Sequence, residues 1–223
     1  RAGGAGRGEG GGVGGGRGRA GRRTRGAAAR GERGGGGGGG RDGAWDPVID
    51  AAGRAAVAED RVVFGGFPGA GVRGIVEASP NEPLPITTDY SMYPNHVAKA
   101  VEFLKRSGVD GPYALALGPR CYTGVIETTE RGGYPVLEHL RLIAGGPVVW
   151  APAVDGAVLV SQRGGDFELV VGQDFSIGYE RHDAESVTLY LEESLTFRAV
   201  GPEAAIGLSY GDAKKPASRG RRR

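Results

Sequence analysis

The most regular pattern in the chain lies between Ser161 and Phe197, where apolar and polar residues alternate. The apolar positions are odd-numbered: Phe167, Leu169, Val171, Phe175, Ile177, Tyr179, Val187, Leu189, Leu191, Leu195 and Phe197. Most even-numbered positions are polar. A period of two is typical of β-strands that bury one face. The pattern therefore predicts a β segment with one buried face.

Turn chemistry divides this segment into strands. Gly172–Asp174 and Arg181–Asp183 contain the glycine and aspartate residues that favour turns, so we expect breaks there. From Ser186 to Ala199 the alternation fails only at Glu193. A strand of that length spans roughly 43 Å at ~3.3 Å per residue, whereas a usual strand has about 5–6 residues. Such a strand suits an elongated, flat, tiling subunit better than a compact enzyme domain.

Helices are predicted before this β segment. Asp46–Pro47 supplies an N-cap and a first position for a helix of about 18 residues that ends at Gly65. A second helix begins at Pro94 and ends before Gly108. Two more are predicted from Pro119 to about Thr128 and from Pro135 to Ala144. Short apolar strands are predicted at Tyr113–Leu117, Val148–Trp150 and Ala157–Val160. This mixture, with an all-β end, predicts the α+β class.

Charge is distributed unevenly along the chain. Residues 1–41 hold ten Arg, two Glu and no aromatic residue, and 211–223 hold six basic residues and one acidic residue. Because the whole chain carries +2, residues 42–210 carry −11. Glycine-rich, apolar-poor segments cannot bury enough surface to offset their ordering entropy. We therefore expect disordered tails at 1–43 and 209–223 around an acidic folded region, which lacks the basic footprint of a nucleic-acid-binding domain.

Other bulk features narrow the class of protein further. The single cysteine excludes an internal disulfide framework and a multi-cysteine metal site. No apolar run approaches the length of a membrane span, and the sequence does not start with the apolar core of a signal peptide. A cytoplasmic protein is the expectation.

Candidate catalytic and cofactor motifs are weak. Gly69–Gly74 fits G-x-G-x-x-G, but a helix precedes it and no good helix follows, so a plain turn is favoured. His96, His139 and His182 lie far apart in no metal-ligand spacing. Cys121 sits early in a helix, where a thiolate is favoured, yet a lone cysteine is more often a small buried hydrophobe. A cysteine or serine hydrolase is a minor alternative. We expect no enzyme activity, cofactor or metal.

Two neighbouring carboxylates interrupt the long strand. Glu192 and Glu193 point to opposite faces of a strand, so they cannot share a proton. Glu193 occupies an expected apolar position. It is either an interfacial salt-bridge partner or part of a solvent-facing strand end, and the second reading is favoured.

The Arg/Gly-rich segment 1–41 raises a functional alternative. Such segments bind RNA through phosphate charge and planar guanidinium contacts. This one lacks the Phe or Tyr residues that usually alternate with Arg-Gly steps, and very GC-rich DNA encodes Gly, Ala and Arg in any frame. An inert or artefactual tail is favoured. The alternative is an RNA-associated protein that binds through this tail.

Residues 44–208 carry a family resemblance. The matching pieces are AVAEDRVVFGGFPGAGVRGI (56–75), DGPYALALGP (110–119), ETTERGGYPVLEHL (127–140), VVWAPAVDGAVLVSQRGGDFELVVGQDFSIGYERHD (148–183) and SVTLYLEESLTFRAVGPEAAIGL (186–208). They resemble the type 1 encapsulins, bacterial shell proteins of the linocin or bacteriocin family, and most of all the actinobacterial members. The combination of RGGDF, GQDxSIGY and a terminal PEAA is highly specific.

The resemblance implies the fold of tailed-phage major capsid proteins, the Hong Kong 97 type. A peripheral domain at 44–109 and 161–208 would contain a spine helix and the long strands, and 110–160 would form an axial domain. Identical subunits would tile an icosahedral shell, which needs one self-complementary set of edges. The shell would enclose a cargo enzyme, a dye-decolorising peroxidase or a ferritin-like protein, bound through its C-terminal targeting peptide.

The resemblance also implies two functional surfaces. The loop that lines the five-fold pore matches Thr129, Glu130, Arg131, Gly132, Gly133 and Tyr134. Five copies of Glu130 and Arg131 would form a charged ring, and the glycines would let it flex. The cargo-peptide groove is partly formed near GQDxSIGY, with candidates Asp174, Phe175, Ile177 and Tyr179. The apolar ones would supply an anchor pocket. The alternative is that they fill the core.

One part of the family pattern is not recognisable. Family members have an N-terminal helix that completes the cargo groove and an extended loop that interlocks neighbours. Here the Gly/Arg-rich segment stands in that place. A wrong start site, a frameshift or a degenerate shell protein would each explain this. Cargo capture and shell closure are therefore the two properties that the sequence leaves open.

Overall fold

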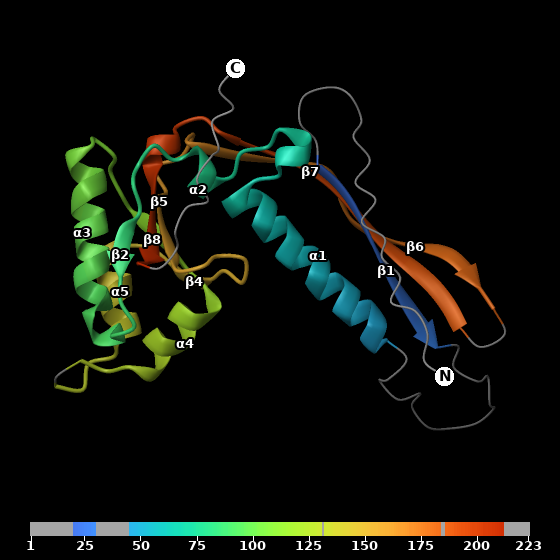
Figure 1. The fold of residues 1–223 in the computed structure, drawn as a ribbon, viewed down its shortest axis with the longest axis horizontal. Coiled ribbons are helices and arrows are strands. Elements are labelled where there is room, and N and C mark those ends of the chain that lie inside the picture. The colour runs from blue at the N-terminus through green and yellow to red at the C-terminus, as the bar shows by residue number, and fades with distance from the viewer. Residues whose placement is uncertain (1–19, 30–44, 131, 184–185, 212–223) are drawn as a thin grey trace, which may run out of the picture. The chain divides into compact units, whose positions relative to one another are not determined.

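The computed structural model describes residues 20–29, 45–130, 132–183 and 186–211 (Figure 1). It divides into two compact units. The first unit is Arg1–Gly74 with Glu168–Arg198, and the second unit is Ile75–Phe167 with Ala199–Arg223. No described helix is both long enough and apolar enough to cross a membrane.

This division differs from the expected domain boundaries. The second unit joins 75–109, 161–167 and 199–208 to 110–160, whereas the family resemblance groups those three segments with the peripheral domain. The physical reason is sheet pairing, since strands from these segments hydrogen-bond into one sheet. The peripheral and axial domains stay a prediction. The strand order is β2-β8-β5-β3-β4. The strands are β2 Leu84–Ile86, β3 Tyr113–Leu117, β4 Val148–Trp150, β5 Ala157–Ser161 and β8 Ala205–Tyr210.

Three helices complete the second unit: α3 Tyr93–Arg106, α4 Pro119–Glu127 and α5 Val136–Ala144. The predicted helix at α3 is confirmed, and Val97, Val101 and Leu104, which recur at helical spacing, are all buried. They join a core with strand residues such as Leu115 and Leu159. Helix α5 ends where Gly145 takes a left-handed conformation, as a C-terminal glycine allows.

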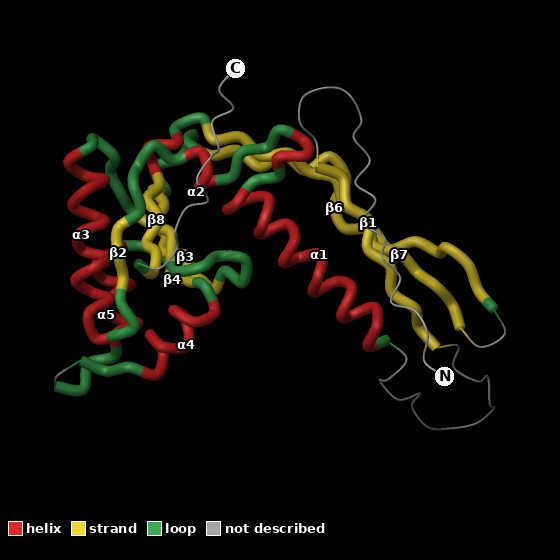
Figure 2. Tube along the Cα trace, viewed as in Figure 1, coloured by secondary structure: helices red, strands yellow, loops and turns green. Residues whose placement is uncertain are grey.

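In the first unit, helix α1 spans Asp46–Gly65. The predicted helix is confirmed, but Trp45 rather than Asp46 is the N-cap, without a side-chain hydrogen bond. The buried positions are Ala51, Ala55, Ala58 and Val62. Three of the four are alanines, and their small side chains let α1 lie close to a strand, here β1. The tube trace shows the two elements (Figure 2).

The first unit also contains a three-stranded sheet of order β1-β7-β6. Strand β6 is Phe167–His182 and β7 is Ser186–Ala199, so the long last strand is confirmed. The predicted break at Gly172–Asp174 is wrong, because β6 runs through it. Pairing with β7 supplies non-local support that overrides a single glycine. The break expected at Arg181–Asp183 comes slightly later, because β6 continues through His182 and only Asp183 lies outside it.

Strand β1, Ala20–Ala29, lies within the segment expected to be disordered. It pairs antiparallel with β7, from Ala20 opposite Leu195 to Ala29 opposite Ser186. The expectation of disorder is therefore corrected for 20–29, because a long strand edge offers backbone partners to any adjacent extended segment. The rest of 1–43 lies outside the described residues, as do 212–223 of the second tail. The expectation of disorder is also wrong for Ser209 and Tyr210, which belong to β8 because they pair with a neighbouring strand.

Burial distinguishes the two long strands. On β7 the odd positions Leu191, Leu195 and Phe197 are buried, as the alternation predicts. On β6 the corresponding apolar residues remain exposed: Leu169, Val171, Phe175, Ile177 and Tyr179. The prediction of a buried face therefore holds for β7 and is wrong for β6. Within the described residues, β6 is an edge strand and α1 runs along β1 at the opposite edge.

Candidate functional site

The loop Thr129–Tyr134 connects α4 to α5 and forms a narrow hairpin. Thr129 and Pro135 form an isolated antiparallel bridge at its base. The Glu130 N–H donates to the Tyr134 carbonyl at 2.8 Å, and the Gly133 N–H donates to the Glu130 carbonyl at 2.9 Å. Gly132 and Gly133 have φ of 108° and 83°, values that other residues rarely adopt. The glycines thus make the tight turn possible. Arg131 lies outside the described residues.

The Glu130 side chain folds back from this loop onto α5. Its Oε1 lies 2.8 Å from Nδ1 of His139, and the two side chains are 27% and 38% exposed. The Tyr134 ring packs edge-on against the His139 ring, with centroids 6.2 Å apart. Sequence reasoning missed His139 here. The available signal was a histidine in the first turns of the helix that follows the loop.

The four candidate groove residues lie together on β6. The Ser176 hydroxyl donates to the Glu192 carbonyl, and a Cβ at Gly178 would lie 2.3 Å from the Tyr190 ring. These contacts place even-numbered residues of the two strands opposite one another.

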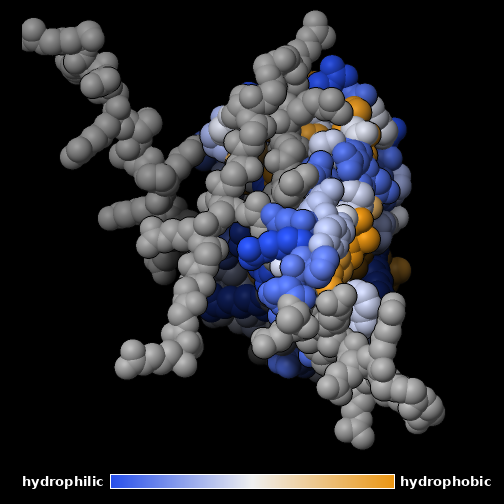
Figure 3. Space-filling model, turned by 90° about the vertical axis from the view of Figure 1, so that its right-hand side faces the viewer, coloured by the Kyte–Doolittle hydropathy of each residue, from blue (hydrophilic) through white to orange (hydrophobic). Residues whose placement is uncertain are grey.

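Phe175, Ile177 and Tyr179 therefore share the other face with Leu191 and Glu193 of β7. Their exposed fractions are 40%, 56% and 57%. The alternative that they fill the core is wrong. We call Phe175, Ile177 and Tyr179 the apolar strip. In Figure 3, which views the molecule from the right-hand side of Figure 1, hydrophobic surface lies open beside hydrophilic residues.

Carboxylates gather next to the apolar strip. Glu193 is only 7% exposed, which corrects the expectation that it faces solvent. Burial, with Glu59 of α1 and Asp174 of β6, raises the pKa of Glu193 to about 7. Burial, with Asp60 and Asp174, also raises the pKa of Glu59. In the described part of the chain, no set of His, Cys, Asp and Glu side chains is arranged to hold a metal ion. Glu193 is thus a buried carboxyl group whose ionised form is disfavoured by burial and by the neighbouring carboxylates.

Cys121 lies at the centre of a buried hydrogen-bond group in the second unit. It is fully buried, and its Sγ lies 3.1 Å from the hydroxyls of Tyr93 and Tyr210, which are 2.7 Å from each other. Burial raises the pKa of both tyrosines. The interpretation of Cys121 as a small buried residue is confirmed.

The G-x-G-x-x-G segment is a turn. Helix α1 precedes it, and the helix that follows, α2 Ile75–Ala78, has only four residues. A short 3₁₀ turn at Pro68–Ala70 ends where Gly71 takes a left-handed conformation. A dinucleotide site needs a strand before the glycines and a long helix after them. The plain-turn reading is confirmed.

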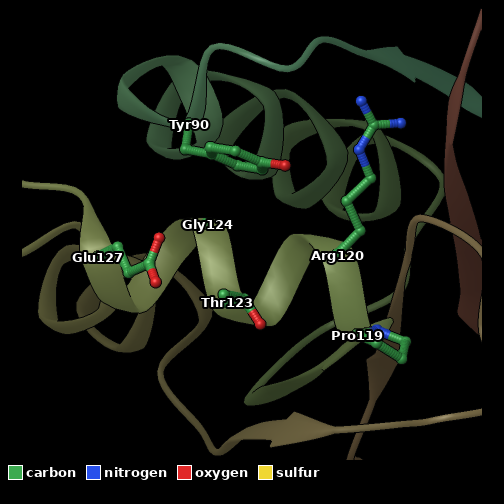
Figure 4. Close-up of a pocket in the computed structure, with 6 residues that line it drawn as sticks. All are labelled: Tyr90, Pro119, Arg120, Thr123, Gly124 and Glu127. Carbon is green, nitrogen blue, oxygen red and sulfur yellow. The ribbon is translucent and has the colours of Figure 1, made fainter.

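A shallow hollow of about 460 Å³ lies beside α4 (Figure 4). Tyr90 lies across Gly124, with Arg120 towards one end of the hollow and Glu127 at the other. The Arg120 guanidinium also sits 4.5 Å from the centroid of the Tyr210 ring. Pro119 and Thr123 complete the lining.

Comparison with known proteins identifies the family. Residues 37–196 match the family model described as "Encapsulating protein for peroxidase". The chain belongs to the encapsulin shell protein family. The type 1 encapsulin shell protein of Rhodospirillum rubrum is 57% identical over 167 residues, which are 75% of this chain and 60% of that protein.

The encapsulin relatives extend beyond this chain. The type 1 encapsulin shell protein of Mycolicibacterium paratuberculosis is 48% identical over 168 residues, 75% of this chain and 63% of its own length. A ferritin-like–encapsulin shell fusion protein of Pyrococcus furiosus is 24% identical over 100 residues, 44% of this chain and 29% of that protein. The chain thus spans about three fifths of the length of its two more similar relatives.

Solved structures support the capsid-type fold. The virus-like particle of Pyrococcus furiosus matches with a TM-score of 0.61 at 17% identity, over 84% of this chain and 76% of that one. The capsid of the myovirus XM1 matches with a TM-score of 0.51 at 6% identity, over 86% of each chain. The expected α+β fold of the phage major capsid proteins is confirmed.

Proposed function

We propose that this chain is a structural subunit of an encapsulin nanocompartment. Many identical copies assemble in the cytoplasm into an icosahedral shell that encloses a cargo enzyme, a dye-decolorising peroxidase or a ferritin-like protein. The observation that carries this proposal is the family match over residues 37–196. The 57% identity to a type 1 encapsulin shell protein adds to it. The chain acts by assembly rather than by catalysis.

The apolar strip is the proposed cargo-docking surface. Its three large side chains lie on one face of an edge strand and are about half exposed. A targeting peptide of the cargo gains apolar burial there, and the edge of β6 offers it backbone hydrogen bonds. Asp174 at the start of the strip contributes charge. We propose for the four candidate residues the role that the family resemblance implies.

The Thr129–Tyr134 loop is the proposed lining of the five-fold pore. It projects between two helices as a hairpin closed by its own hydrogen bonds. In a closed ring, five copies of such a loop narrow a shared opening, and the charged residues Glu130 and Arg131 set its electrostatic character.

Electron microscopy of the purified protein tests the shell proposal. Two forms are compared, the chain as it stands and a chimera in which the N-terminal part of the Rhodospirillum rubrum relative replaces residues 1–43. We expect closed particles of uniform size from the chimera. Light scattering measures the particle size of the same samples in solution. If the chimera is monomeric in both measurements, the proposal is wrong.

A further inference from the structure

We infer that His139 is a positioning residue that holds the Thr129–Tyr134 loop against helix α5. The contact between His139 and Glu130 lies within the second unit of a single chain and does not depend on assembly. Only its effect on a pore rests on the proposed function.

Helix geometry explains why His139 reaches the loop. It is the fourth residue of α5, and its N–H donates to the Pro135 carbonyl at 3.2 Å, as in a first helical turn. Side chains on a helix lean towards its N-terminus. A histidine at this position therefore points back at the segment that enters the helix, which is the loop. The 2.8 Å contact with Glu130 follows from that direction.

The loop has few other attachments beyond its base. The base is tied by the Val136 N–H to the Thr128 carbonyl at 3.1 Å, and by the Thr128 hydroxyl to the Gly124 carbonyl at 2.6 Å. The two hairpin hydrogen bonds join residues within the loop, so they do not fix the loop relative to the helices. Among the described residues, the side-chain contacts that tie the hairpin to α5 both converge on His139, from Glu130 and from Tyr134.

The pairing changes what Glu130 contributes to the loop. A carboxylate that hydrogen-bonds to an imidazole on α5 is held at the side of the hairpin. Without His139 it would be a free anion on a turn with two left-handed glycines. His139 thus sets the position of the loop and the place of the Glu130 carboxyl group on it, and both bear on what a ring of such loops lets pass.

Hydrogen exchange on the full-length chain tests the inference directly. The reporters are the Glu130 and Gly133 amides, because both donate the hairpin hydrogen bonds. We expect His139→Leu and Glu130→Gln each to speed their exchange roughly three- to ten-fold. The double variant should exchange no faster than the faster single variant. His139→Asn keeps an N–H donor near Nδ1 and should stay close to the unchanged chain.

Glu138→Gln is the matched control. Glu138 is the neighbour of His139 on α5, and it pairs with Arg141 rather than with the loop. Its replacement should leave the two amides unchanged. Unchanged exchange in both His139→Leu and Glu130→Gln overturns the inference, whatever the state of assembly. A failure of the chimera to form particles overturns the proposed function instead and leaves this inference standing.

Discussion

Glu193 of β7 lies buried near Glu59 of α1, and the second carboxylate adds to the effect of burial in raising the pKa of the first. Asp174 on the neighbouring strand β6 acts in the same direction. The packing of α1 on this sheet thus encloses a carboxyl group that is most favourable when it carries a proton.

Because the pKa of Glu193 is raised, we expect the free energy of unfolding to fall as pH rises. The folded pKa of about 7 exceeds the ordinary value of 4.5. The native state therefore holds the proton more tightly, and its stability decreases between pH 4.5 and 7. Glu193→Gln keeps the neutral shape and should stabilise the chain at pH 8 by about 3 kcal/mol or less, with little change at pH 4.5.

Urea unfolding at the two pH values measures this effect. The control is Asp50→Asn, which removes an exposed carboxylate from helix α1 and should change stability little at either pH. An equal effect of Glu193→Gln at both pH values would contradict the assignment.

His96 predicts the opposite dependence. Burial and the charge of Lys99 lower its pKa from the ordinary 6.5, and its Nε2 is buried without a hydrogen-bond partner. Above pH 6.5 the imidazole is neutral in both states and stability is unaffected. As pH falls below 6.5, the unfolded state binds the proton more readily than the folded state, so the stability of the fold decreases. His96→Leu should therefore stabilise the chain more at pH 5 than at pH 8. Thermal unfolding at both pH values decides the sign.

The apolar strip predicts a loss of cargo binding without a loss of fold. Ile177 is 56% exposed, so Ile177→Asp removes little buried contact from the chain itself. In the chimera it should weaken the binding of a fluorescent cargo targeting peptide at least roughly ten-fold. Val170→Asp, at another exposed apolar position of the same strand, is the control. Fluorescence anisotropy gives both affinities, and equal losses would argue against a specific docking surface.

Two glycines predict opposite changes in stability. A Cβ at Gly118 would lie 2.1 Å from the backbone carbonyl of Val154, which cannot turn aside as a side chain can. Gly118→Ala should destabilise the second unit by roughly 1–3 kcal/mol. Gly53 lies within α1 with no atom within 4 Å of such a Cβ. Gly53→Ala should stabilise the helix by about 0.5–1 kcal/mol. Differential scanning calorimetry compares the two variants.

Several elements were predictable because their signals are local. The α3 stripe repeats every three to four residues, and Gly145 follows the last apolar residue of α5, so both helices have a recognisable period and end. Strand β7 shows the same clarity at period two. The family resemblance depends on ordered motifs and needed no coordinates either. Strand β8 had no such signal, because Ala205–Tyr210 is short and lacks a clear alternation.

The candidate site divides in the same way. Motifs located the loop Thr129–Tyr134 and the strip on β6, but neither the partner of Glu130 nor the exposure of Ile177 is a local property. Asp174 and Phe175 were expected beside a turn, and they lie within a continuous strand. The role of these residues in a pore and in cargo binding stays a prediction.

By itself, the sequence determined the α+β class, the helices α1, α3, α4 and α5, the long strand β7 and the family. These depend on residues a few positions apart, or on motifs in fixed order. Only the tertiary structure decided that the same apolar alternation is buried on β7 and open on β6, that Glu193 is enclosed, and that His139 meets Glu130. Burial and pairing depend on which distant segment lies across a face, and no local period records that.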